Sequence, residues 1–393
     1  MSGSPTPAWD LAVVGAGPAG ATAALAALRH APHLRVALLD RADFPRDKCC
    51  GDGVAPHVLD VLEPLGAGDV VSGWTPLSRL DLARGERVVG NRMARPVHVV
   101  PRRVLDARLV EHATAAGATL LHHRVRDLTV GPDGVLLDGR LLARVVVGAD
   151  GAHSAVRVAV GAAERSPQAL AIRGYAPVTA RLARRQLIRF GDRPQPAYAW
   201  AFDRGDGLVN VGYGELAGDG EPLSRALLLD QLERLVPGAA ATGTDWRAHH
   251  LPLSSWGWGP EQPDGPVLLA GDAAGLVNPM TGEGIYYAVA TGALAGVSAA
   301  RALGAGAPDQ AGLRHRTAVR GLLGRHLHHT WTAARLTRVP AVVDAGIRAA
   351  AADRRVFDQL VELGLGDGRI TPRLAGRLVR HLLPTRAPGS PAR

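Results

Sequence analysis

The sequence predicts an α/β fold: a Rossmann-like nucleotide-binding domain, interrupted by an antiparallel-sheet domain and followed by C-terminal helices. Three observations support it. A strand, a glycine turn, a helix and a second strand follow one another near the start of the 393-residue chain. A second glycine-rich segment follows another apolar run about 250 residues later. Stretches of alternating apolar and polar residues lie between them. A chain this long exceeds one comfortable core, so two or three subdomains are expected.

The first unit begins with the apolar run 10–14, which stops at a glycine and is predicted to be a buried strand. The alanine-rich stretch 19–30 is predicted to be a helix that ends before Pro32. The run 34–39 is the second strand and closes at Asp40. Right-handed parallel pairing is expected for such a unit.

Gly15, Gly17 and Gly20 form the pattern G-x-G-x-x-G between the first strand and the helix. The first glycine permits the tight turn, the second lets backbone approach a pyrophosphate, and the third lets helix and strand pack closely. Free N–H groups at the helix N-terminus meet the phosphates. Asp40 stands where a carboxylate hydrogen-bonds the adenosine ribose and repels a 2′-phosphate. The unit therefore predicts a dinucleotide site that disfavours NADP.

The remaining elements assign the chain to four regions. Helices are predicted over 54–65, 105–116 and 281–303, and strands over 77–100, 119–121, 141–147, 168–213, 249–258 and 267–270, with a turn at 131–134. The nucleotide-binding domain is then discontinuous, over 9–75, 100–165 and 262–305. The substrate-binding sheet domain takes 76–99 and 166–261. A helical region over 306–384 and a disordered tail over 385–393 complete the chain.

Composition excludes several classes of protein. A content of 47% hydrophobic and 21% charged residues is ordinary for a globular chain. No run reaches the roughly 18 apolar residues that span a membrane, and the polar N-terminus lacks the pattern of a signal peptide. Cys49 and Cys50 are the only cysteines and are adjacent, which argues against a disulfide-stapled secreted fold. We therefore expect a cytoplasmic protein.

The charge is unevenly distributed. Residues 312–393 hold 15 Arg and 5 Asp or Glu, whereas the whole chain carries +9, so the rest is close to neutral. This basic C-terminal region can make a peripheral contact with an acidic membrane, face an anionic substrate, or simply be a solvated helical face. No stacking platform or DNA-reading motif accompanies the charge, so nucleic-acid binding is not expected.

In two later motifs, a predicted strand is again followed directly by a glycine-containing turn. Asp150-Gly151 follows one predicted strand, and Gly271-Asp272 follows another and leads into Pro279-x-x-Gly282-x-Gly284-Ile285. The ordered set resembles flavoprotein hydroxylases, halogenases and geranylgeranyl reductases, whose cofactor domain is of the glutathione-reductase type. The resemblance implies that Asp150 and Gly151 lie near the pyrophosphate of FAD and that Asp272 contacts its ribitol and pyrophosphate end. It also implies that the loop packs on the isoalloxazine edge, where N–H groups of Gly282 and Gly284 aid catalysis.

The stretch 44–53 favours one of these families over the others. Pro45-Arg46-Asp47-Lys48-Cys49-Cys50-Gly51 resembles the Pro-Arg-x-Lys-x-Cys-Gly signature of the geranylgeranyl reductase family. On that match Cys50 is the family cysteine beside flavin and substrate, and Cys49 is a variable position. Arg102 through Asp106 resembles the family's Arg-x-x-x-Asp helix start, which places Arg102 toward the flavin. The resemblance covers roughly residues 9–300 and fades beyond.

Lys48 is the only lysine of the chain. An ammonium beside Cys50 would lower the pKa of its thiol and favour a thiolate, which donates no proton. Lys48 is therefore better explained as a structural or substrate-phosphate contact. Cys50 itself is a catalytic candidate, either as a proton donor or as a small, polarizable group that shapes the cavity.

Aromatic residues mark the substrate side. Tyr198, Trp200 and Phe202, followed by Asn210-Val211-Gly212, resemble the family's Tyr-x-Trp-x-Phe-Pro and Asn-Val-Gly strands, with Asp203 standing where the family usually has proline. Trp256 and Trp258 lie at period two in a predicted strand, where they line a hydrophobic cavity or pack in the core. These five aromatic residues are the candidate substrate contacts.

The resemblance implies non-covalent FAD and a large apolar substrate. The expected cofactor contacts are Gly15, Gly17, Gly20, Asp40, Arg41, Arg46, Cys50, Gly51, Arg102, Asp150, Gly151, Gly271, Asp272, Pro279, Gly282, Gly284 and Ile285. Because only one glycine fingerprint occurs, NAD(P)H or an electron carrier is expected to bind transiently. No metal is expected, since His326, His328 and His329 have no Cys, Asp or Glu grouped with them.

Three functions use such a scaffold. A reductase passes hydride from reduced flavin to a carbon–carbon double bond, a monooxygenase activates O₂ for hydroxylation or epoxidation, and a halogenase captures hypohalous acid on a lysine. The absence of a second lysine and of Trp-x-Trp-x-Ile-Pro argues against the halogenase. The Lys-x-Cys-Gly and Tyr-x-Trp-x-Phe matches favour the reductase, and the monooxygenase of secondary-metabolite biosynthesis stays as the alternative.

Overall fold

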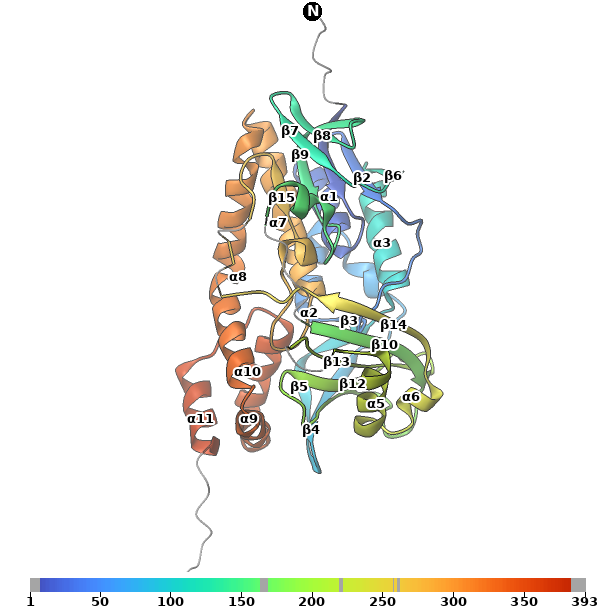
Figure 1. Ribbon diagram of the computed structural model, residues 1–393, viewed down its shortest axis with the longest axis vertical. Coiled ribbons are helices and arrows are strands. Elements are labelled where there is room, and N and C mark those ends of the chain that lie inside the picture. Colours follow the sequence, from blue (N-terminus) through green and yellow to red (C-terminus); the bar gives the residue numbers. More distant parts are fainter. Residues whose placement is uncertain (1–7, 163–168, 219–221, 257, 260–261, 383–393) are drawn as a thin grey trace, which may run out of the picture.

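A computed structural model describes residues 8–162, 169–218, 222–256, 258–259 and 262–382. The predicted disordered tail 385–393 lies outside these residues. Two sheets organise the chain, one above the other in Figure 1, with the C-terminal helices along one side of both. No helix in the described ranges is long and apolar enough to cross a membrane.

The first sheet belongs to the nucleotide-binding domain. Its order is β6 (Thr119–His122), β2 (Val36–Asp40), β1 (Trp9–Val14), β9 (Leu141–Gly148), β8 (Gly134–Leu137) and β7 (Leu128–Gly131), with β15 (Val267–Leu269) also beside β9. The pairs among β6, β2, β1, β9 and β15 are parallel, and β7 and β8 form an antiparallel extension. Strand β1 reads as an apolar run because both faces of a parallel sheet are covered.

Helices α1 (Pro18–His30) and α7 (Ile285–Gly304) cross this sheet in close contact with each other. A Cβ placed on Gly292 would lie 2.2 Å from the carbonyl oxygen of Ala19, and one on Gly296 2.2 Å from that of Ala23. Only glycine therefore allows this approach, which holds the middle of α7 against α1. Helix α3 (Arg102–Ala115) also packs against α1.

The second sheet has the order β14 (Thr244–Leu251), β10 (Ala169–Pro177), β13 (Leu208–Leu216), β12 (Ala197–Asp203), β11 (Gln186–Phe190), β4 (Leu77–Arg84), β5 (Arg87–Val99) and β3 (Gly53–Val54). All neighbours are antiparallel except β4 and β11, which are parallel. In β12 the small residues Ala197, Ala199 and Ala201 pack toward helix α5 (Arg225–Leu235), so the aromatic residues between them face the other way.

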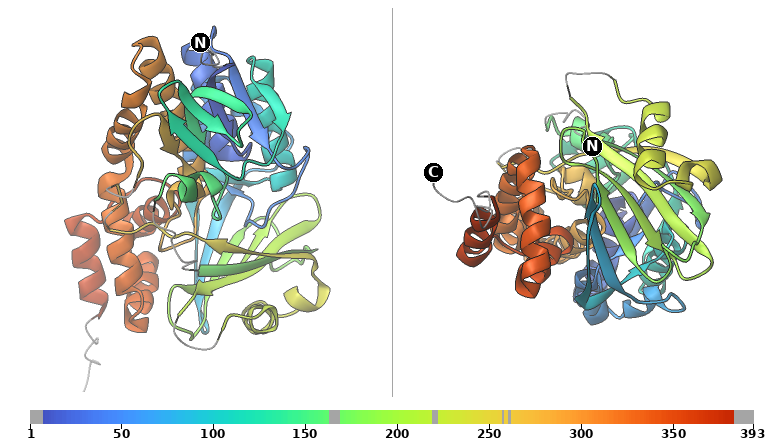
Figure 2. Two further views of the ribbon diagram at one scale, coloured as in Figure 1. Left: turned by 45° about the horizontal axis from the view of Figure 1, so that its top comes forward. Right: turned by 90° about the horizontal axis from the view of Figure 1, so that it is seen from below.

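The C-terminal helices are α8 (Ala311–Leu336), α9 (Pro340–Ala352), α10 (Arg354–Leu365) and α11 (Pro372–Leu382). Helix α8 runs beside α7, and α9 and α10 lie against β4 and β5, as the two views of Figure 2 show. Their shared core includes Leu80, Val97, Val343, Ile347 and Phe357. The shorter helices are α2 (Pro56–Leu62), α4 (Ala155–Ala159) and α6 (Ala239–Thr242), with 3₁₀ turns at Glu63–Leu65, Gly68–Val71, Gly271–Ala274 and Pro308–Gln310.

Two predicted boundaries are wrong. The helix expected from 281 begins at Ile285, because Gly282 has a φ of +67° and its N–H bonds back to Asn278 in a turn. The strand expected over 249–258 ends at Leu251, and Trp256 and Trp258 lie beyond it.

Candidate active site

A cavity of about 1220 Å³ runs between the two sheets. It exceeds the roughly 300–1,000 Å³ of an ordinary small-molecule site, so it has room for a cofactor and a second ligand. Its walls include Gly15 and Gly17 at one end, the loop 279–284 in the middle and residues of α8 to α11 at the other end. Of the predicted site residues, Gly20, Gly271, Trp256 and Trp258 do not line it.

The glycine turn faces two arginines. A Cβ on Gly17 would lie 3.3 Å from an Nη of Arg46 and 3.8 Å from one of Arg102. Asp106 holds both guanidinium groups, accepting from Arg102 at 2.6 and 2.8 Å and from Arg46 at 2.9 Å. Two oriented guanidinium groups beside the N-terminus of α1 form a site for a diphosphate.

Asp40 ends β2 beside this turn. One of its carboxylate oxygens accepts the N–H of Ala16 at 2.9 Å, and Arg46 lies 3.6 Å from the same oxygen. The other oxygen accepts the N–H of Ala42 at 3.0 Å. Asp40 thus fixes the glycine turn as well as lining the cavity, and Arg41 beside it is exposed at the rim.

Two motif residues hold the scaffold rather than face the cavity. A Cβ on Gly20 would lie 1.7 Å from the carbonyl oxygen of Gly15, so the turn can close only on glycine. Gly271 has a φ of +58° and packs against Ala19 and Ala288. Asp150 lines the cavity, but its carboxylate caps α4, accepting from the Ser154 hydroxyl at 2.5 Å and the Ala155 N–H at 2.7 Å.

Lys48 and Asp272 form an ion pair in the cavity wall, with 2.9 Å between Nζ and Oδ2. Burial opposes ionisation of Asp272, but the Lys48 ammonium outweighs it and holds the pKa of Asp272 below its usual value. The Lys48 ammonium is thus engaged with a carboxylate, and burial raises the pKa of the Cys50 thiol.

The cysteine loop is fastened to the second sheet by two fully buried residues, Arg173 and Asn210. Arg173 donates to Asp47 at 2.9 and 3.1 Å, to the Lys48 carbonyl at 2.9 Å and to the Cys50 carbonyl at 3.3 Å. Asn210 donates to the Cys50 carbonyl at 2.9 Å and to Asp52 at 2.8 Å. Cys50 is thereby held in the cavity wall, next to Cys49, whose pKa burial raises to about 12.

Tyr198, Trp200 and Phe202 line the cavity from β12. The indole N–H of Trp200 donates to Oδ1 of Asn210 at 2.8 Å. A Cβ on Gly212 would lie 2.2 Å from Trp200 Cζ2, so the glycine of Asn-Val-Gly makes room for the indole. The Tyr198 hydroxyl donates to the Thr281 carbonyl, which ties the aromatic strand to the loop 279–284. Asp203 lies outside the cavity and accepts the N–H groups of Arg184 and Gly205 at the end of the strand.

The loop 279–284 is braced from the C-terminal side. Asn278 donates to the Leu363 carbonyl at 3.0 Å, and the Thr281 hydroxyl to the Gly364 carbonyl at 2.8 Å. Pro279, Gly282, Gly284 and Ile285 line the cavity together with Glu283. Helix α10 therefore helps to position a loop predicted to bind the flavin edge.

Trp256 and Trp258 are not brought into the cavity. Trp256 is 50% exposed and stacks on His328 of α8 at 4.3 Å between ring centroids. Trp258 is buried and donates to the Ala274 carbonyl at 2.9 Å. The interpretation as substrate contacts depended on a strand that ends before them. Their contacts are those of packing residues.

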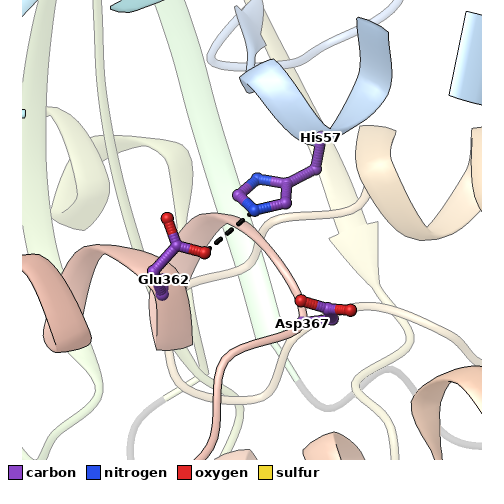
Figure 3. Close-up of side chains that lie close together, drawn as sticks. All are labelled: His57, Glu362 and Asp367. Carbon is purple, nitrogen blue, oxygen red and sulfur yellow. Dashed lines mark hydrogen bonds and ion pairs between the residues drawn. The ribbon is translucent and has the colours of Figure 1, made fainter. Parts of the chain in front are cut away.

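Two clusters contain residue types that can bind metal ions, and hydrogen bonds or ion pairs engage their histidines. His326 bonds to Tyr287 at 2.5 Å and His329 accepts the Ile370 N–H at 2.8 Å, so they point to different partners. His57, Glu362 and Asp367 lie close together in Figure 3, and His57 pairs with Glu362 at 2.9 Å. That bond raises the pKa of His57 and lowers the pKa of Glu362, and it joins α2 to α10.

The residues fit FAD. The glycine turn and two arginines suit its diphosphate, Asp40 lines the cavity beside that turn, and the Lys48–Asp272 pair lies in the same cavity wall. Glycines at positions 282 and 284 leave that loop free of side chains that would displace a planar ring.

Comparison with known proteins agrees with this geometry. Residues 8–194 match the FAD binding domain family. Menaquinone reductase of Mycolicibacterium smegmatis is 33% identical, over 73% of this chain and 75% of the relative. Geranylgeranyl diphosphate reductase of Rhodobacter capsulatus is 32% identical, over 76% and 77%. The chain belongs to the geranylgeranyl reductase family. It is an FAD-dependent oxidoreductase, which confirms the predicted family and cofactor.

The solved structures agree on the fold of this geranylgeranyl reductase family member. A geranylgeranyl bacteriochlorophyll reductase-like protein of Thermoplasma acidophilum superposes with a TM-score of 0.76 at 17% identity, covering 96% of this chain and 100% of the other. The predicted fold class is therefore confirmed. The roles of individual site residues stay predictions.

Sequence reasoning missed three features of the site. Arg173 is a single residue in an unremarkable strand, and no local pattern marks it. Glu283 lies between the two glycines of the loop motif, and the motif itself gives the intervening position no role. The residues of α8 to α11 that line the cavity lie where the family resemblance fades. The alternating pattern of β12 indicates only that its aromatic face packs against some other part of the chain.

Proposed function

We propose that the protein reduces a carbon–carbon double bond of a large apolar substrate, an isoprenoid or a related natural product. The observation that carries this proposal is the apolar extension of the cavity, away from the glycine turn. Side chains from four C-terminal helices and the second sheet line it: Leu80, Leu82, Val97, Ile188, Phe190, Ala333, Leu336, Val342, Val343, Ile347, Leu360, Val361, Leu374 and Leu378. Such a lining favours a long hydrocarbon chain, because burying its surface stabilises the complex by about 25 cal/mol per Å².

FAD, when bound and reduced, supplies the hydride. The chain's own residues bind the cofactor at the glycine turn, and the aromatic face of β12 and the cysteine loop confine the double bond. Tyr198 ties β12 to the loop 279–284, so the two walls keep a fixed separation. The apolar walls exclude water from the reacting carbons.

The named relatives support reduction over oxygenation, since menaquinone reductase and geranylgeranyl diphosphate reductase are both reductases. Electrons are proposed to come from NAD(P)H or a separate carrier that binds transiently. One glycine fingerprint occurs in the sequence, and the FAD domain uses it.

The test is anaerobic incubation of dithionite-reduced protein with prenyl substrates of graded length, followed by mass spectrometry. A gain of two hydrogens without O₂ is expected. Gly346→Trp should slow reduction of long substrates but not of short ones, because Gly346 lines the apolar extension. Gly376→Trp, on the exposed face of α11, is the matched control and should change neither. An added oxygen atom that requires O₂ would instead support a monooxygenase.

We also propose that the basic C-terminal region contacts an acidic membrane surface as the route of substrate entry. Leu336 lines the cavity yet is 52% exposed, so the cavity reaches the surface there. Val339 is exposed in the turn between α8 and α9, and Val379 and Leu382 are exposed on α11. Arg335 and Arg338 lie at or next to the end of α8, and Arg377 and Arg380 lie on α11. Cosedimentation with anionic vesicles, lost in Val379→Asp and absent with neutral vesicles, is the expected result, and equal binding to both would contradict it.

A further inference from the structure

We propose that Glu283 is the proton donor of the reaction, delivering a proton to the carbon adjacent to the one that receives hydride. This inference rests on the proposed alkene reduction and names the acid that it requires. Glu283 lies between Gly282 and Gly284, in the loop predicted to meet the flavin edge, and it lines the cavity.

The position of the carboxyl group suits this role. Oε1 accepts the N–H of Tyr286 at 2.9 Å, which orients the side chain at the start of α7. Within the described ranges no ion pair joins Glu283 to a basic side chain, and its partial exposure is to the cavity that it lines. A carboxyl group held in this way can carry a proton to a ligand in the cavity.

Other carboxyl groups of the cavity wall are already engaged. Asp47, Glu215 and Asp272 pair with Arg173, Arg193 and Lys48 at 2.6 to 2.9 Å. Asp40 is held by two backbone N–H groups and lies near Arg46, and Asp150 caps α4. Asp47, Glu215 and Asp272 thus have fixed cationic partners, and the Asp150 carboxylate is committed to the cap of α4 although burial raises its pKa.

The non-carboxylic donors are weaker candidates. The Tyr198 hydroxyl already donates to the Thr281 carbonyl, and burial raises the pKa of Tyr198. Burial raises the pKa of Cys50 above 9.0, whereas it raises the pKa of Glu283 to about 7. The Glu283 carboxyl therefore ionises nearer to neutral pH than the Cys50 thiol, and part of it carries a proton at pH 7.

The step balances with the groups named. The π bond of the substrate breaks, one carbon gains hydride as the reduced flavin is oxidised, and its neighbour gains the proton from Glu283. Two C–H bonds form and the carboxyl group is left as a carboxylate. Glu283 then recovers a proton from water after the product leaves.

Several groups face Glu283 and set its titration. The backbone N–H groups of Ile285 and Tyr286, His57 of α2 and Arg102 of α3 favour its ionised form. Cys50, Tyr198 and Tyr287 lie near enough to interact with its charge. Burial outweighs the first set, and loss of the proton above about pH 7 should slow alkene reduction.

The experiment compares wild type, Glu283→Gln and Cys50→Ser as FAD-loaded proteins. Glutamine keeps the oxygen that accepts from Tyr286, so FAD content and the helix start are expected to persist. Infrared spectra between pH 5 and 8 should show protonated carboxyl signals that disappear near pH 6 for Asp52 and near pH 7 for Glu283, and Glu283→Gln should lack only the signal that disappears near pH 7. In anaerobic single turnovers Glu283→Gln should be slower than wild type by about 100-fold or more, and its loss of rate should exceed that of Cys50→Ser.

The outcomes separate the two proposals. Wild-type rates in Glu283→Gln, or persistence in this variant of the carboxyl signal that disappears near pH 7, would overturn the role of Glu283 and leave alkene reduction standing. A large loss in Cys50→Ser with none in Glu283→Gln would move the proton donor to Cys50. If the wild type reduces no alkene under anaerobic conditions, the proposed function fails and the role of Glu283 fails with it.

Discussion

Asn210 provides a stringent test of how the cysteine loop is joined to the aromatic strand. It makes three hydrogen bonds of 2.8 to 2.9 Å, to the Trp200 indole, the Cys50 carbonyl and Asp52. In Asn210→Ala the Cys50 carbonyl still accepts from Arg173, and Asp52 still accepts from the Tyr175 hydroxyl. Only the Trp200 indole N–H is left without its hydrogen-bond partner. One orphaned donor at about 1–3 kcal/mol and two weakened acceptors at about 1 kcal/mol each predict a loss of about 3–5 kcal/mol.

Asn210→Asp should behave differently. The aspartate keeps an oxygen that accepts from the Trp200 indole. Its second oxygen replaces the amide nitrogen that donates to Asp52, so two carboxyl oxygens would lie about 2.8 Å apart. Two carboxyl groups at that distance cannot both ionise, so folding raises their pKa values. Stability should therefore be retained in acid and lost as the pH rises, and Asn210→Asp should be less stable than Asn210→Ala at pH 8.

The assay is urea unfolding at pH 5 and pH 8 with FAD in fixed excess, since bound FAD adds to apparent stability. Relative to wild type, the Asn210→Ala deficit should be larger at pH 8 than at pH 5, because the amide of Asn210 lowers the pKa of Asp52 and its loss disfavours the ionised carboxylate. Equal stability of Asn210→Asp and wild type at pH 8 would refute the hydrogen-bond network described.

Three further predictions concern single residues. Asp272→Ala should weaken FAD binding by about 10- to 100-fold in equilibrium dialysis, because one lost hydrogen bond to the cofactor costs about 1–3 kcal/mol, and unchanged affinity would contradict its placement. Trp200→Ala should raise the KM for substrate more than it lowers FAD content, whereas Trp256→Ala, outside the cavity, should change neither; equal losses would make Trp200 a core residue. Burial raises the pKa of Asp52 from 3.8 to about 6, so its contribution favours the folded state below pH 4 and is lost, by about 3 kcal/mol, as the pH rises through 6. Asp52→Asn should flatten this dependence in urea unfolding, and an unchanged slope would contradict it.

Most of the cofactor domain could be predicted from the sequence. A strand that stops at glycine has few folded alternatives, so β1, α1 and β2 were predicted within a few residues. The roles of individual glycines were less visible. Gly20 was assigned to helix–strand packing, and it lies against the Gly15 carbonyl and the Val13 side chain of β1. Gly292 and Gly296 were not singled out in an alanine-rich helix.

The substrate side was harder to predict because it depends on contacts distant in sequence. Trp256 and Trp258 have the spacing of a strand, yet tertiary packing against α8 and Ala274 decides their place. Arg173 and Asp47 are 126 residues apart, and no local pattern encodes such a pair. Glu283 and the helices α8 to α11 meet at the cavity only after the chain has folded.

The central claim is that the electrons of the reduced flavin pass directly to a carbon–carbon double bond. The most direct measurement is the visible spectrum of dithionite-reduced, desalted protein mixed with an apolar alkene substrate without O₂. We predict return of the oxidised flavin spectrum, with one double bond reduced for each flavin oxidised. A flavin that stays reduced until O₂ is admitted, with an oxygen atom then found in the product, would contradict the account.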